Sequence, residues 1–210
     1  MTATVHDPST LRVLDDATRA LVRLAAVVSG GAERAVRDEM SAAYRQVPAA
    51  WVEELLLQSY LFAGFPRALN AMREWRRLEP EIATSSASND ADTVRADGES
   101  TCAAVYGSMY ERLRQNIRAL HPLLDEWMIT EGYGKVLSRP ALDLGRRELC
   151  IVAACAASGQ DRQLHSHLHG AVNVGVATSV IDQSLDALAD ILGAERSRDV
   201  QLLWARVKGK

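Results

Sequence analysis

The chain has 210 residues, of which 48% are hydrophobic, enough for one compact domain or two small ones with a sizeable core. Its 24 Lys and Arg residues nearly balance its 27 Asp and Glu residues, so charge gives no basis for binding nucleic acid or an anionic membrane. No stretch approaches the roughly 18 apolar residues of a membrane span, and the amino terminus lacks a secretion-signal pattern. We therefore expect a cytoplasmic protein that binds neither membrane nor nucleic acid.

Apolar residues recur at three- and four-residue spacing along most of the chain, without the strict alternation of a β-strand. This pattern predicts an all-α fold with about ten helices. Pro48 and Pro66 suit first helical turns, whereas Gly31, Gly64 and Gly159 suit helix ends. The predicted helices cover roughly residues 15–28, 32–46, 48–63, 66–78, 101–120, 122–131, 143–158, 160–175, 178–192 and 193–207.

Two stretches interrupt the helical pattern. Residues 81–99 are small and polar with almost nothing to bury, and they predict a flexible linker. Residues 132–140 contain glycine and proline and predict a loop that leads to Asp143, which can cap the next helix. These breaks suggest an N-terminal helical repeat at residues 1–80 and a C-terminal helical repeat at residues 100–210.

The two halves are related by an internal repeat with a shift of 128 residues. Under this shift Arg19 meets Arg147 and Gly31 meets Gly159, so packing positions and the glycine turn coincide. The polar set differs, because the second half places Glu148, Gln160, Gln163 and His167 where the first half has Ala20, Ala32, Ala35 and Glu39. We therefore expect a degenerate site in the first half and the candidate site in the second.

The candidate site lies in a predicted helical hairpin at residues 147–175. An Ala-rich helix ends at a glycine, and a histidine-rich helix follows it. At about 100° per residue, Gln160, Gln163 and His167 share one side of the second helix. Glu148, near the start of the first helix, would approach the His167 end of its antiparallel partner. The pattern predicts that a carboxylate, an imidazole and two carboxamides converge between the helices.

Other residues with possible chemistry have less specific patterns. His165 and His169 have the i, i+4 spacing that can hold a metal ion, but spacing indicates no third ligand, so we predict a solvated face and no metal site. Cys102, Cys150 and Cys155 are an odd number without a Cys-x-x-Cys spacing, which argues against disulfides and structural zinc. We interpret Cys150 and Cys155 as small core residues.

Two segments resemble the carboxymuconolactone decarboxylase family of the alkylhydroperoxidase D-like superfamily. In one segment, Arg147-Glu-Leu-Cys precedes a glycine turn, His167 follows Gly159 by eight residues, and Asn-Val-Gly175 closes the helix. The other segment, Tyr60–Met72, is similar to the family's Tyr-x-Gly-x-Pro-x-x-Asn pattern. The resemblance implies an alkylhydroperoxidase D-like helical fold that self-associates as a trimer or hexamer, with sites between helices near subunit contacts.

The chain departs from the hydroperoxidase branch of that superfamily. In that branch, two cysteines and a histidine follow a glutamate after 12, 15 and 19 residues, and counting from Glu148 gives Gln160, Gln163 and His167. A carboxamide cannot form the thiolate that attacks a peroxide, so we do not expect peroxidase activity of this type. The departure points to the decarboxylase branch. The Gly-x-Pro segment is clear only in the first half, so a complete site would need two halves or two subunits to pack together.

The family reaction is loss of carbon dioxide from a carboxylated unsaturated lactone, without a metal or organic cofactor. The resemblance therefore implies a cofactor-independent decarboxylase or related lyase acting on a small-molecule substrate, an unsaturated lactone or organic acid. In this hypothesis, His167 donates or relays a proton and Glu148 orients His167. Hydrogen bonds to substrate oxygens would come from Gln160, Gln163 and, as a further candidate, Tyr133.

Two alternatives stay open. The protein could be a catalytically silent oligomer whose fold serves assembly or ligand binding, as the degenerate first half illustrates. It could also be an alkylhydroperoxidase-type antioxidant protein using Cys150 or Cys155, although neither has a partner thiol at a useful spacing. Activity screening tests the first alternative, and thiol titration tests the second.

Overall fold

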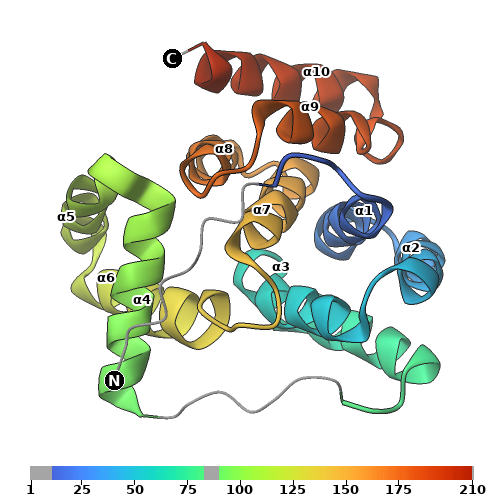
Figure 1. The fold of residues 1–210 in the computed structure, drawn as a ribbon, viewed down its shortest axis with the longest axis horizontal. Helices are drawn as coiled ribbons and strands as arrows, with labels where there is room; N and C mark the ends of the chain where they lie inside the picture. The colour runs from blue at the N-terminus through green and yellow to red at the C-terminus, as the bar shows by residue number, and fades with distance from the viewer. Residues whose placement is uncertain (1–10, 83–89, 210) are drawn as a thin grey trace.

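The computed structural model describes residues 11–82 and 90–209, and every regular element within them is helical, which confirms the all-α prediction (Figure 1). No helix in these residues is long and apolar enough to cross a membrane. The elements in chain order are α1 (Asp16–Gly30), α2 (Glu33–Gln46), α3 (Ala49–Leu78), α4 (Ala91–Tyr106), the 3₁₀-helix η1 (Gly107–Met109), α5 (Tyr110–Leu120), α6 (Pro122–Trp127), the π-helix η2 (Met128–Leu137), α7 (Leu144–Ser158), α8 (Asp161–Asn173), α9 (Thr178–Asp186) and α10 (Ala189–Lys208).

Helices α1 and α7 pack side by side at the centre of the fold (Figure 1). Both begin at an aspartate cap: Asp15 accepts a hydrogen bond from the Thr18 amide, and Asp143 accepts one from the Arg146 amide. The two starts are adjacent, because Arg146 Nε donates to Thr18 Oγ1 at 2.8 Å. The two helices that the 128-residue shift relates therefore lie against each other.

The remaining helices surround this central pair. Helices α2 and α3 pack on α1, α8 packs on α7, and α4 packs against both α8 and η2. Helices α9 and α10 cover the end of the molecule farthest from η2 in the view of Figure 1. Buried apolar side chains from both predicted repeats belong to one hydrophobic cluster. The boundaries of the two repeats stay a prediction.

The predicted break at Gly64 takes the form of a kink inside α3. Gly64 has φ 79° and ψ 159°, a conformation that only glycine adopts readily, and the chain resumes its helix at once. Helix α10 contains the same kind of kink at Gly193, with φ 76° and ψ 167°. The third helix of the first half and its counterpart in the second half are therefore interrupted in the same way.

The structure corrects two predictions about irregular segments. Helix α4 begins at Ala91, inside the predicted linker 81–99, because Asp90 caps it and its inner face carries residues that pack on η2. The predicted loop 132–140 is helical to Leu137 as part of η2. These two helices cross with backbones in contact, since a Cβ on Gly98 would lie 2.2 Å from the Ile129 carbonyl oxygen. Of the predicted linker, residues 83–89 lie outside the described residues.

Candidate functional site

Glu148 and His167 form a buried pair between α7 and α8. Their side chains approach because Gly159, in a left-handed conformation with φ 72°, turns the chain so that α8 runs back along α7. His167 Nδ1 and Glu148 Oε2 are 2.8 Å apart, a hydrogen-bonding distance. Glu148 is 0% exposed and His167 is 4% exposed. A carboxylate and an imidazole thus meet in the interior.

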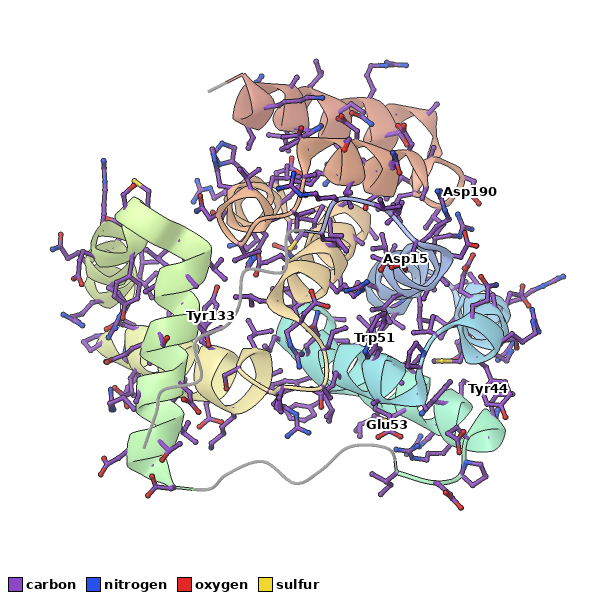
Figure 2. All side chains as sticks on the ribbon, viewed as in Figure 1. Asp15, Tyr44, Trp51, Glu53, Tyr133 and Asp190 are labelled. Atoms are coloured by element: carbon purple, nitrogen blue, oxygen red, sulfur yellow. The ribbon has the colours of Figure 1, made fainter. Side chains whose placement is uncertain are left out.

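Aromatic side chains from three other elements surround the imidazole. The ring of Phe62, from α3, meets the His167 ring edge-on at 5.7 Å between centroids. Tyr106, from the last turn of α4, lies 6.4 Å from the same ring and 6.2 Å from the ring of Tyr133. Tyr133, labelled in Figure 2, reaches this position from η2. The pair therefore lies in a buried, low-dielectric environment with an aromatic neighbour on α3 and two phenols close by.

Both phenols are held in the protonated form. Burial raises the pKa of Tyr133 well above its ordinary value, and the nearby charges of Tyr106 and Glu148 raise it further. Burial also raises the pKa of Tyr106, although hydrogen bonding to Tyr133 opposes the shift. At neutral pH both hydroxyls therefore keep their protons and can act as hydrogen-bond donors.

The two oxygens of Glu148 differ in their hydrogen bonding. Oε1 is buried and has no hydrogen-bond partner among the described residues, whereas Oε2 is bonded to His167. A buried acceptor without a donor costs roughly 1–3 kcal/mol. Glycine at position 170 makes the space for the carboxylate, because a Cβ there would lie 2.5 Å from Oε2 and 2.8 Å from Val105 Cγ1. The fold thus keeps a costly, unsatisfied carboxylate in the interior.

The two glutamines do not join this pair. Gln160 is the N-cap residue of α8, and its exposed side chain makes no capping hydrogen bond. Gln163 is also exposed. Both stand in the first turn of α8, before the helix reaches the layer of α4 and α7 that covers His167. The predicted convergence of four side chains is therefore replaced by a carboxylate–imidazole pair with Tyr133 and Tyr106 nearby.

His165 and His169 lie on a different face of α8, half-buried, with ring centroids 4.9 Å apart. Within residues 11–82 and 90–209, no group of three or more histidine, cysteine, aspartate or glutamate side chains could hold a metal ion. The two imidazoles instead contribute to a groove between α8 and α5.

The three cysteines are buried and free. Burial raises the pKa of the Cys102 and Cys155 thiols to about 12, and the charge of Glu148 adds to both shifts. Burial raises the pKa of Cys150 as well. Because the thiolate is the reactive form, these side chains are inert at neutral pH.

Tyr106 is the neighbour of the pair that sequence analysis missed. It stands 42 residues before Glu148 on a separate helix, so no helical spacing relates the two. Phe62 was visible only as one aromatic residue in the segment resembling the family pattern. Their positions depend on how α3 and α4 pack, and a local pattern carries no such information.

The fold and site define an all-α protein with a glycine-linked helical hairpin, whose two helices contribute a buried glutamate and histidine. Residues 122–206 match the model of the carboxymuconolactone decarboxylase family, which confirms the resemblance found in the sequence. The match includes η2 and the whole α7–α8 hairpin. The chain is also 26% identical over 160 residues to "Peroxisomal protein 2" of Schizosaccharomyces pombe, an alignment that covers 72% of this chain and 75% of that protein.

Proposed function

We propose that this carboxymuconolactone decarboxylase-like protein is a cofactor-independent lyase that decarboxylates a small unsaturated lactone or organic acid through proton transfer by His167. The observation that carries the proposal is the buried hydrogen bond between His167 and Glu148, whose second oxygen has no donor within residues 11–82 and 90–209. A buried polar atom without a partner calls for an explanation, and a catalytic role is one such explanation. The family match over residues 122–206 supports the same reaction class.

The chemistry follows from the pairing. When the bond to the departing carboxylate breaks, its electron pair passes into the conjugated lactone carbonyl and carbon dioxide leaves. Glu148 holds the proton on Nδ1 of His167, so Nε2 on the other side of the ring exchanges a proton with substrate. The imidazolium then protonates the dienolate carbon and recovers its proton from solvent. Tyr133 and Tyr106 are the donors proposed for the dienolate oxygen.

A catalytically silent binding protein is the competing proposal, and the burial of His167 supports it. With 4% of the residue exposed, a substrate reaches the imidazole only when a neighbouring side chain moves. The same burial is compatible with the lyase, because active sites commonly close around their substrates and exclude water.

The test is a decarboxylation screen with His167→Gln, Glu148→Gln and a control. The wild-type protein is incubated with carboxylated unsaturated lactones and β-keto acids, and release of carbon dioxide is measured. We expect His167→Gln to lower kcat by about 10²–10⁴-fold, the usual contribution of a general acid. Glu148→Gln keeps the shape but removes the charge, so we expect a smaller loss. Arg162→Gln, at an exposed position of the same helix, is the control for altered helix stability and should keep kcat.

Two results would defeat the proposal. One is equal turnover by wild type and His167→Gln on a substrate that the wild type converts. The other is no turnover on any acid in the screen, together with binding of one of them, which would favour the silent binding protein.

A further inference from the structure

A groove of about 440 Å³ lies on the outer side of α8, facing the ends of α4 and α5. This volume is in the range of sites for small organic molecules. The groove, named here the α8 groove, is lined by Val105, Tyr106, Ser108, Met109, Leu113, Asn116, His165, Ser166, His169 and Asn173. It contains neither glutamine of the candidate site, so it is a separate feature of the hairpin.

The lining of the α8 groove suits a molecule with an apolar body and a negative end. Val105, Met109 and Leu113 provide apolar surface, while His165 and His169 lie close together on one wall. None of the residues that line the groove is an aspartate or glutamate, so a carboxylate would meet no like charge there. Imidazole N–H groups donate hydrogen bonds to carboxylate oxygens, and these bonds strengthen when the ring is charged.

The α8 groove lies next to the buried pair. Tyr106 lines the groove, and its ring lies 6.4 Å from that of His167. Val105 also lines the groove, and a Cβ on Gly170 would lie 2.8 Å from Val105 Cγ1 and 2.5 Å from Glu148 Oε2. Residues of the groove wall are therefore direct neighbours of the buried pair.

We propose that the α8 groove is the binding site for the substrate's carboxylate-bearing end, with His165 and His169 as its recognition residues. The existence of a carboxylate site stands on the groove itself, whereas its link to turnover rests on the proposed function. Tyr106 borders both the groove and His167, which fits its proposed role as a donor to the dienolate oxygen.

The first experiment measures binding of benzoate, an aromatic carboxylate of suitable size, by titration calorimetry. Benzamide has the same shape without the charge and serves as the ligand control. We expect benzoate to bind and the double variant His165→Gln/His169→Gln to bind it at least about tenfold more weakly, the loss of one charge-assisted hydrogen bond. His121→Asn, which replaces a histidine outside the groove and keeps a capping side chain at α6, should bind benzoate as the wild type does.

The proposal fails if benzamide binds as well as benzoate, or if the double variant keeps the wild-type affinity. Kinetics then separate this inference from the proposed function. The double histidine variant should raise KM with little change in kcat, since it removes binding common to ground and transition states. His167→Gln should lower kcat. If His167→Gln loses turnover but the double variant keeps the wild-type KM, the groove proposal alone is wrong. If the double variant raises KM but His167→Gln keeps the wild-type kcat, the role of His167 alone is wrong.

Discussion

The α1–α2 and α7–α8 hairpins share their caps and packing contacts but carry different polar residues. Each hairpin begins at an aspartate N-cap. In each, an arginine from a later helix donates hydrogen bonds to backbone carbonyl oxygens near the end of the first helix. Arg67 donates to carbonyl oxygens that include that of Val28, and Arg196 donates to that of Ala156. These equivalent contacts support the predicted repeat independently of the sequence match between the two halves. Packing positions are thus shared, and the differences between the hairpins identify what the second one adds.

Three of the differences between the hairpins lie next to one another in the structure. Glu148, His167 and Gly170 of the second hairpin stand where the first hairpin has Ala20, Glu39 and Ala42. In the first hairpin Glu39 forms an ion pair with Arg23 at 2.6 Å, and the same arginine binds Asp190, labelled in Figure 2. The comparison shows that the interior carboxylate of Glu148 occurs together with a partner imidazole and with a glycine that gives it room. We use substitutions that exchange these features to test the comparison.

The largest expected effect is at Arg147, the residue before the site glutamate. Its buried guanidinium binds Glu54 at 2.7 Å and also donates to Gln58 Oε1. Its counterpart, Arg19, is exposed. Replacing Arg147 with Met leaves a buried carboxylate short of a partner and should lower the free energy of unfolding by about 3–5 kcal/mol. Arg19→Met, the matched control, should change it by no more than about 0.5 kcal/mol. Urea unfolding measures both, and similar losses would show that the arginines are equivalent.

The next largest effect is expected at Gly170, where the sign of the change in the free energy of unfolding tests the packing. Gly→Ala inside a helix ordinarily stabilises by roughly 0.5–1 kcal/mol. Here the new methyl group would meet Glu148 and Val105, so we expect Gly170→Ala to destabilise by about 1–3 kcal/mol. Gly132→Ala is the control, because a Cβ there meets nothing within 4 Å. A stabilised Gly170→Ala protein would mean that the carboxylate does not occupy that space.

The comparison also shows which parts of the site sequence reasoning could reach. Helical periodicity and the glycine turn place Glu148 opposite His167, because both positions are fixed by spacing within one hairpin. The glutamines of α8 share the face of His167, yet they are exposed, since spacing gives a direction around a helix and not what covers it. Tyr106 depends on the packing of α4, which a local pattern does not contain.

The two wrong predictions about irregular segments have a physical cause in the same region. The outer face of α4 is polar, which made residues 90–99 look like part of a linker. Its inner face nevertheless has buried residues at helical spacing, including Val94, Gly98 and Cys102. The segment before α7 was predicted as a loop because of its glycines, whereas Gly134 lets η2 approach α4 closely. The glycines that suggested breaks in the sequence are the residues that let α4 and η2 pack closely.

A third prediction couples the carboxylate to the glycine. If Gly170 exists to make room for Glu148, then Gly170→Ala should cost much less in a protein that already carries Glu148→Ala, the residue found in the first hairpin. We expect a coupling free energy of about 1–2 kcal/mol in a double-mutant cycle of unfolding free energies. Rescue is incomplete because Val105 Cγ1 would still lie 2.8 Å from the new methyl group. Additive losses would show that the two residues are independent.

The smallest effect is expected at a position where both hairpins carry a small buried side chain. Cys155 of α7 stands where α1 has Val27, and both are buried. Copying the first hairpin with Cys155→Val should change the free energy of unfolding at pH 7 by less than about 1 kcal/mol. A larger loss at neutral pH would show that the thiol has a structural or redox role that a valine cannot fill.

The pH dependence of the same variant sharpens this test. Burial raises the pKa of Cys155 from 9.0 to about 12, so the thiol's contribution to stability is complete below pH 9. It is lost as the pH rises from 9 toward 12, because only the unfolded chain ionises there. The wild type should therefore lose up to about 1.4 kcal/mol per pH unit more than Cys155→Val above pH 9. Urea unfolding at pH 8 and pH 10 measures this difference. Parallel pH profiles, or rapid reaction of the native thiol with a disulfide reagent at pH 8, would contradict a sealed cysteine and restore the redox hypothesis.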